Sequence, residues 1–181
     1  NGYNYHYKAS EIIKSERGSY PDAVASATSV DFIEMFYRFS AVSPYQQELR
    51  IAQSLANGGT ADLYMCGRLD THRDKSGYKA LQRMFQYHKD NEQDYRLIET
   101  NAEIALIKPS LDFHSFLNGH NLGGYFGWYN VLSQHHHLFD CINASSLAKV
   151  SIDKYKILIL PNISTLTDTV AGRLDTFVKD G

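Results

Sequence analysis

The sequence is poor in cysteine, has no excess of charge of one sign and contains no long hydrophobic run. Its two cysteines, Cys66 and Cys141, are too few for a disulfide framework, and because each lies among apolar residues we expect two buried thiols. The 18 basic and 20 acidic residues give a net charge of −2, which argues against a nucleic-acid partner. A transmembrane helix needs about 20 apolar residues, and apolar stretches such as 157–160 are far shorter, so we expect no membrane span.

The sequence does have the composition of a globular protein, with many aromatic residues. Of 181 residues, 43% are hydrophobic and 21% are charged, which excludes a disordered chain. The 13 Tyr, 9 Phe and 1 Trp can stack on sugars, although composition alone favours a role in the core. Because the chain begins with Asn1 and ends at Gly181 within a fading helix, we expect a segment of a longer protein. Its compartment stays open, with the cytoplasm slightly favoured.

Hydrophobic periodicity predicts strands alternating with helices in the first half. The clearest helix has Ser43 as N-cap, Pro44 at its first position and Gln46 to complete a capping box, and it ends at Asn57-Gly58-Gly59. Its expected buried stripe consists of Leu49, Ala52, Leu55 and Ala56. The other expected elements are a loop over 1–27 with a short helix near 10–15, a largely buried strand over 30–39 that runs into a loop, a strand over 61–66, and a helix over 77–91.

The second half repeats the alternation after a charged stretch over 89–99. Strands that are continuous apolar runs and alternate with helices are typical of parallel sheets, so we predict an α/β fold throughout. The opening of this half is typical of a doubly wound, flavodoxin-like sheet. The expected elements are strands over 102–108, 139–142 and 155–160, a loop over 110–121, a helix over 123–136 and a last helix capped by Thr167.

The second half resembles the middle domain of family 42 beta-galactosidases, often called the beta-galactosidase trimerisation domain. The segments that carry the resemblance are 102–107, 124–132, 138–140, 153–162 and 177–181. The first half resembles the end of a (β/α)8 barrel of the same kind of enzyme, in segments 37–39, 43–47 and 56–59.

The resemblance implies two incomplete domains. Residues 1–98 would be the C-terminal section of a (β/α)8 barrel. Residues 99–181 would begin a flavodoxin-like, class I glutamine amidotransferase-like domain that serves in assembly. It further implies a carbohydrate substrate, self-association, and no metal or organic cofactor.

Glu34 is the candidate catalytic residue. Retaining glycosidases use two carboxylates about 5–5.5 Å apart, one as nucleophile and one as acid/base. The resemblance implies a nucleophilic Glu at the end of the seventh barrel strand, which Glu34 matches if that strand is 30–35. The acid/base residue would then lie upstream of this chain. The alternative is a structural Glu34 paired with Arg38.

The loop after the next expected strand supplies candidate sugar ligands. Arg68, Asp70 and His72 follow Gly67, on the face where barrel enzymes carry their sites, and each can hydrogen-bond a sugar hydroxyl. A solvated loop with internal ion pairs is the alternative. The run 135–137 is three histidines, but consecutive helix residues point in different directions, so we expect no metal site there.

Three hypotheses follow for the function. In the first, the chain belongs to a beta-galactosidase-like glycoside hydrolase and is inactive alone, because at most one carboxylate of the pair is present. In the second, it is a non-catalytic carbohydrate-binding or oligomerisation module with a degenerate barrel. In the third, it is a flavodoxin-like binding protein, although 110–124 carries no recognised phosphate-binding fingerprint. Amidase chemistry is not expected, because neither cysteine lies on a strand-to-helix turn.

Overall fold

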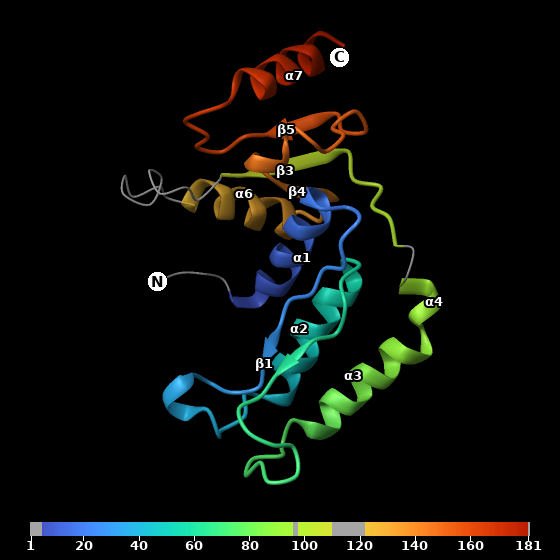
Figure 1. The fold of residues 1–181 in the computed structure, drawn as a ribbon, viewed down its shortest axis with the longest axis vertical. Helices are drawn as coiled ribbons and strands as arrows, with labels where there is room; N and C mark the ends of the chain where they lie inside the picture. The colour runs from blue at the N-terminus through green and yellow to red at the C-terminus, as the bar shows by residue number, and fades with distance from the viewer. Residues whose placement is uncertain (1–4, 96–97, 110–121, 181) are drawn as a thin grey trace. The chain divides into compact units, whose positions relative to one another are not determined.

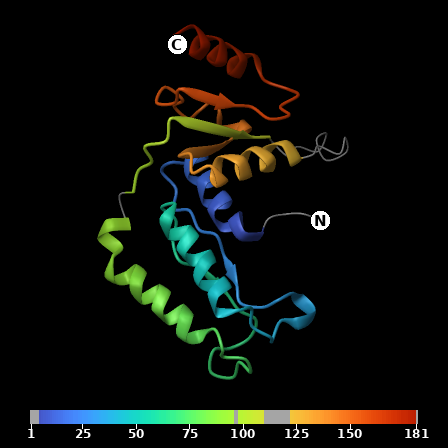
Figure 2. The same cartoon turned by 180° about the vertical axis from the view of Figure 1, so that it is seen from behind.

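A computed structural model describes residues 5–95, 98–109 and 122–180, which form helices and parallel sheets (Figures 1 and 2). The contacts divide the chain into two compact units, one of residues 1–13 and 24–99 and the other of residues 14–23 and 100–181. Each unit holds one sheet, and both sheets are parallel. The predicted α/β chain with parallel sheets is therefore confirmed.

The first unit is built around a short parallel strand pair. Ser29 pairs with Leu63 and Val30 with Tyr64, so the strand expected over 61–66 is only two residues long. Helix α1, expected near 10–15, is longer than predicted and contributes to both units. The elements are η1 (Tyr5–Tyr7), α1 (Lys8–Ser19), β1 (Ser29–Val30), η2 (Met35–Tyr37), α2 (Pro44–Ala56), β2 (Leu63–Tyr64), α3 (Tyr78–Asp90) and α4 (Glu92–Tyr95).

Helix α2 begins and ends where its sequence signals predict. Ser43 is the N-cap and Pro44 the first helical residue, but the Ser43 side chain makes no capping hydrogen bond, so the predicted capping box is wrong. At the other end Gly58 has a φ of 77°, a left-handed conformation that suits glycine. The predicted buried stripe is wrong except for one member, since the buried residues are Gln47, Ile51, Ser54 and Leu55.

The strand predicted over 30–39 is wrong beyond its first residue. The backbone leaves the sheet after Val30 and folds out as a loop over 33–40. Val42 N donates to the Asp31 carbonyl (2.8 Å), and this hydrogen bond closes the base of the loop. The loop is apolar yet exposed, so its hydrophobic pattern does not reflect burial in a sheet.

The second unit contains a three-stranded parallel sheet in the order β4-β3-β5. Tyr129 of helix α6 packs edge-on against Phe139 of β4, with ring centroids 5.0 Å apart. Ile142, in the same strand, belongs instead to the core cluster that includes Val170 of α7. Helices therefore cover both faces. The elements are β3 (Ile104–Lys108), α6 (Gly123–Gln134), β4 (Phe139–Asn143), η3 (Ala144–Ser146), β5 (Ile157–Ile159) and α7 (Asp168–Lys179).

The last turns of α1 cover the outer edge of β4. Lys14 Nζ donates to the Phe139 carbonyl (2.6 Å), and Asn143 N donates to the Ser19 hydroxyl (2.8 Å). Between them, a Cβ on Gly18 would lie 2.1 Å from the Cys141 carbonyl oxygen, so only glycine allows this approach. An unpaired strand edge invites association with another chain, and this helix protects it.

The predicted loop over 110–121 lies outside the described residues. Among the helices that the structure describes, none is both long and apolar enough to span a membrane.

Candidate functional site

The candidate site lies at the carboxyl ends of β1 and β2. Because the two strands run parallel, the loops that follow them, 31–43 and 65–77, leave from the same edge of the sheet. In α/β proteins this edge is the usual place for ligands and catalytic groups. A hollow of about 240 Å³ lies there, lined by Phe39, Cys66, Gly67, Arg68, Thr71, His72 and Arg73.

Gly67 sets the direction of the loop that forms most of this pocket. Its φ is +100°, a conformation that other residues rarely adopt, and it follows β2 by three positions. A Cβ at this position would lie 3.9 Å from the Phe39 ring. The turn at Gly67 therefore brings the loop after β2 next to the loop after β1.

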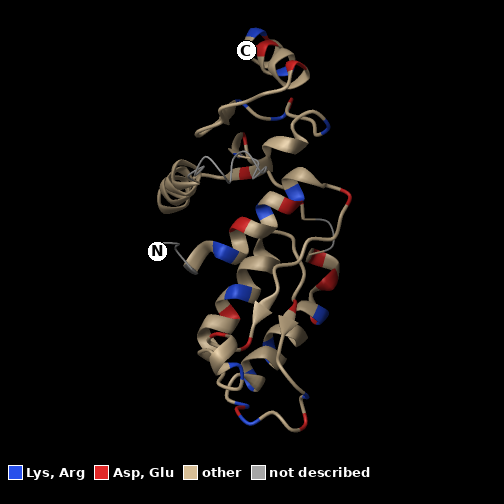
Figure 3. Ribbon diagram, turned by 60° about the vertical axis from the view of Figure 1, so that its left-hand side comes forward, with Lys and Arg blue, Asp and Glu red and all other residues tan. Residues whose placement is uncertain are grey.

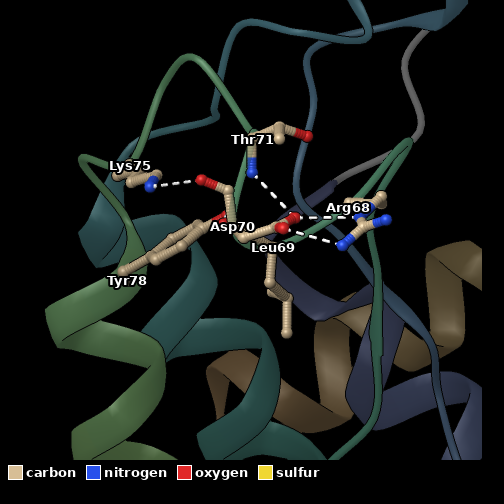
Figure 4. A network of polar contacts seen from close by, with 6 residues as sticks. All are labelled: Arg68, Leu69, Asp70, Thr71, Lys75 and Tyr78. Atoms are coloured by element: carbon tan, nitrogen blue, oxygen red, sulfur yellow. Dashed lines mark hydrogen bonds and ion pairs between the residues drawn. The ribbon is translucent and has the colours of Figure 1, made fainter.

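An ion pair holds Arg68 at the pocket. Asp70 accepts hydrogen bonds from Arg68 Nε (3.0 Å) and Nη2 (2.8 Å) and from Thr71 N (3.0 Å), as Figure 4 shows. These contacts, with the Arg68 hydrogen bond the largest cause, lower the pKa of Asp70. Lys75 Nζ donates to the Asp70 carbonyl (2.9 Å). Figure 3 shows the alternation of acidic and basic residues in this loop.

Asp74 ties the loop after β2 to the loop after β1. Its Oδ2 accepts from Ala41 N (2.9 Å) and its Oδ1 from Ser76 N (3.1 Å). The Ser76 side chain, followed by these backbone groups, lowers the pKa of Asp74. The Tyr78 hydroxyl donates to the Leu69 carbonyl (3.2 Å) and anchors the loop to the first residue of α3 (Figure 4). The pocket is thus formed by loops with fixed ends.

His72 is buried, with only 6% of its surface exposed. Its Nδ1 lies 2.9 Å from the Asp74 carbonyl oxygen, which can only accept, so Nδ1 carries a hydrogen. The ring lies 6.4 Å from Phe39 and 6.2 Å from Tyr78 between centroids. Its Nε2 is buried and has no hydrogen-bond partner among the described residues.

Asp31, directly after β1, is a buried carboxylate that sequence reasoning missed. It is 1% exposed, and its Oδ1 accepts a hydrogen bond from Gln47 Nε2 of α2. Within the described residues, Asp31 Oδ2 and Gln47 Oε1 have no hydrogen-bond partner. Burial raises the pKa of Asp31, and the Gln47 hydrogen bond and the charge of His72 offset this only in part. The sequence signal that could have identified Asp31 is its position as an acidic residue within an apolar run.

Glu34 does not lie at the end of a strand. It is exposed, has extended backbone angles (φ −163°, ψ 172°) and precedes the short helix η2. The strand-end position that we assigned to it belongs to Asp31, because β1 ends at Val30. Arg38, its alternative partner, donates to the Met35 carbonyl (3.4 Å). The nucleophile role of Glu34 stays a prediction.

The structure brings together two of the three predicted sugar ligands. Arg68 and His72 line the pocket, whereas Asp70 is not among the lining residues and holds Arg68 from outside. Phe39, which lines the pocket from the other loop, was missed because its neighbourhood was expected to be a strand.

The candidate metal ligands and the two cysteines lie within the described part of the chain. No group of three His, Cys, Asp or Glu side chains could hold a metal ion in that part of the chain, and His135, His136 and His137 are exposed. Cys66 is partly buried at the pocket and Cys141 is buried in β4, so the expectation of two buried thiols holds for Cys141 alone.

Comparison with known proteins gives one structural likeness and no sequence relative. No family model and no curated protein matches the chain. Among solved structures, alpha-L-fucosidase isoenzyme 2 from Paenibacillus thiaminolyticus superposes with a TM-score of 0.73 at 18% identity. The chain therefore shares the fold of the matched part of that structure. The match covers 100% of this chain and 27% of the fucosidase, and at this identity it concerns the fold alone.

Proposed function

We propose that this chain is a segment of a glycoside hydrolase and that the loops after β1 and β2 form part of its sugar-binding site. The observation that carries the proposal is the match of the whole chain to part of an alpha-L-fucosidase. A pocket at the carboxyl edge of a parallel strand pair supports it, because barrel enzymes hold their substrates at that edge.

The two domains of the proposed enzyme are residues 1–98, from the end of a (β/α)8 barrel, and residues 99–181, from a flavodoxin-like, amidotransferase-like domain. Each strand of the first unit is followed by a helix, and such barrels are built from repeated strand-helix pairs. In the second unit the first strand lies between the next two, which is how the flavodoxin-like order 2-1-3 begins. Both observations support the assignment.

In this proposal Arg68 and His72 bind sugar hydroxyls, and Asp70 positions Arg68 through the bidentate ion pair. Hydrolysis uses two carboxylates, and Glu34 is the candidate from this chain. The chain spans 27% of the fucosidase, so the activity belongs to the full protein and the 181-residue chain alone is inactive. The substrate is a glycoside of the beta-galactoside or alpha-L-fucoside class.

The test is hydrolysis of nitrophenyl glycosides by the full protein. We expect release of nitrophenol from the beta-D-galactoside or the alpha-L-fucoside, and a loss of at least a hundredfold in kcat for Glu34→Gln if Glu34 is the nucleophile. Glu16→Gln, at an exposed position of α1, is the matched control. Activity that Glu34→Gln leaves unchanged removes Glu34 from the mechanism, and no hydrolysis of any glycoside contradicts the enzyme proposal.

The second candidate function is a non-catalytic module that binds carbohydrate or self-associates. It is favoured by the exposed apolar loop after β1, in which Ile33 is 63%, Met35 58% and Phe36 92% exposed. Exposed apolar patches are typical of interaction surfaces. Phe36→Ser should lower self-association in sedimentation velocity, whereas Val24→Ser, at an 83% exposed site outside this loop, should not. Sugar binding without turnover by the full protein would favour this function.

A further inference from the structure

The exposed loop over 33–40 is held in a defined conformation by its own backbone. At its base, Phe32 forms an antiparallel bridge with Ala41. Within the loop, Tyr37 N donates to the Glu34 carbonyl (2.9 Å), which closes the short helix η2. A surface that is already ordered loses little conformational freedom when it binds a partner. The loop therefore presents its side chains as a preformed surface.

The side chains at the tip of this loop have the composition of a protein interface. Met35, Phe36 and Tyr37 form η2, and each is more than half exposed. Aromatic residues, Met and Arg are enriched where proteins contact one another, and aromatic side chains supply much of the binding energy there. Arg38 follows these three residues directly. The tip of the loop is therefore suited to contact another protein surface.

One acidic and one basic residue flank the apolar tip. Glu34 precedes it, and the Glu34 carboxylate has no hydrogen-bond or ion-pair partner within the part of the chain that the structure describes. Arg38 follows the tip, donates to the Met35 carbonyl (3.4 Å) and lies 5.1 Å from the Phe39 ring centroid, but no described carboxylate pairs with it. The loop is therefore neutral as a whole, with one unbalanced charge of each sign on either side of an apolar segment.

Resting on the second candidate function, in which the chain self-associates, we propose that the loop over 33–40 binds the same loop of a second copy of this chain. In a two-fold contact a surface meets itself in the reversed direction, so it must be complementary to itself. This loop meets that requirement: Phe36 packs against its counterpart, while Glu34 of each copy pairs with Arg38 of the other. The charges fix the register of the contact, and the apolar tip supplies the affinity.

The test is charge reversal in the full protein, followed by sedimentation velocity over a range of concentrations. Glu34→Arg and Arg38→Glu should each weaken self-association at least about tenfold, because two symmetry-related attractions become repulsions. A one-to-one mixture of the two variants should associate again, and so should a chain that carries both reversals. The matched controls are Glu16→Arg in α1 and Lys79→Glu in α3, which reverse exposed charges outside the loop and should change little.

The outcomes separate this inference from the proposed functions. A full protein that stays monomeric overturns the inference, and another part of the protein or a carbohydrate would then cover the loop. Association that neither reversal weakens, or that neither the mixture nor the double reversal restores, overturns it as well. Hydrolysis of glycosides, or sugar binding without turnover, is measured separately and supports its own function whatever the association state. Because Glu34 and Arg38 are both exposed, the variants should fold.

Discussion

The two units pair their buried aspartates in opposite ways. In the second unit, Asp140 Oδ2 accepts hydrogen bonds from the Tyr155 hydroxyl (2.8 Å) and from Lys154 Nζ (3.0 Å). Burial, and next the charge of Asp140, raise the pKa of Tyr155, so its hydroxyl stays a donor. In the first unit, Asp31 is buried more deeply, yet within the described residues its carboxylate accepts a hydrogen bond only from the neutral amide of Gln47.

The same contrast holds for every buried side-chain atom without a partner among the described residues. The four such atoms, Ser29 Oγ, Asp31 Oδ2, Gln47 Oε1 and His72 Nε2, all belong to the first unit. An unpaired buried polar group costs free energy, so proteins seldom keep one without a reason. Of these four residues, His72 lines the pocket.

The two units also differ in the length of their strands and in the size of their apolar clusters. Among the described residues, the second unit has strands of five, five and three residues and a core cluster that includes Ala105, Ile107 and Ile142. The described part of the first unit has strands of two residues and smaller clusters, such as one around Ile13 and one around Ile51 and Leu55. We therefore expect the second unit to carry more of the stability and the first unit to carry the site.

Truncation of the core of the second unit should have the largest effect. Leu106 is fully buried in β3, and Leu106→Ala should lower the free energy of unfolding by about 3 kcal/mol through lost contacts and a cavity. Fluorescence of Trp128, the single Trp of the chain, reports on this unit during denaturant unfolding. Leu138→Ala, at a 69% exposed site, is the control and should change little. A loss below about 1 kcal/mol for Leu106→Ala would contradict our account of this core.

Displacement of α1 from the edge of β4 should come next. Gly18→Ala places a methyl group 2.1 Å from the Cys141 carbonyl oxygen, and we expect a loss of about 2 kcal/mol even though alanine favours helix. Gly172→Ala in α7, where a Cβ meets nothing within 4 Å, should instead gain about 1 kcal/mol. Equal effects of the two variants in the same denaturant titration would show that α1 does not pack on this edge.

Replacement of Asp31 should stabilise the first unit at neutral pH. Because the pKa of Asp31 is raised in the fold, its contribution is fully present below the ordinary value of 3.8 and is lost as pH rises through the folded pKa. An asparagine side chain cannot ionise, so Asp31→Asn should raise the free energy of unfolding at about pH 7 and leave it unchanged at about pH 4. Hydrogen exchange of α2 and α3 measures this unit, with the exposed Asp22→Asn as control. A loss at neutral pH would mean that the Asp31 carboxylate is stabilised in its charged form.

Sequence patterns located the helices and strands that carry local signals. They failed for segments whose structure depends on whether their apolar residues are buried. The caps at Ser43 and Thr167 and the apolar run of β3 depend on neighbouring residues, so they could be located. The run over 30–39 looks identical to a buried strand, but only Ser29–Val30 pairs, because the following residues leave the sheet as an exposed loop. Composition does not reveal which apolar residues find a partner.

The site was predictable to the same limited extent. Arg68 and His72 could be proposed because polar residues after a strand lie at the functional edge of a parallel sheet. Asp31 could not, since its burial depends on Gln47, which α2 brings to it from 16 residues away. Phe39 joins the pocket only because Gly67 turns the other loop toward it.

The smallest predicted effect lies at the end of α6, where the histidine run has a backbone role. His136 has a φ of 57°, and the hydrogen bonds from His136 N to Ser133 O (3.2 Å) and from His137 N to Leu132 O (2.9 Å) form a Schellman motif. Helix α2 ends in the same motif with Gly58 at this position. His136→Gly should therefore gain about 0.5 kcal/mol, the relief of left-handed strain less the added freedom of the unfolded chain.

The matched control for this variant is His135→Gly, one residue earlier. His135 has a φ of −90°, which any residue adopts, so its replacement relieves no strain and should cost a few tenths of a kcal/mol. Both variants can be followed through Trp128 in the same helix during thermal unfolding. Since the two histidines are exposed and adjacent, charge and composition change equally, and only the sign of φ separates them. A shift of the same sign in both would mean that the end of α6 is not held in the left-handed conformation.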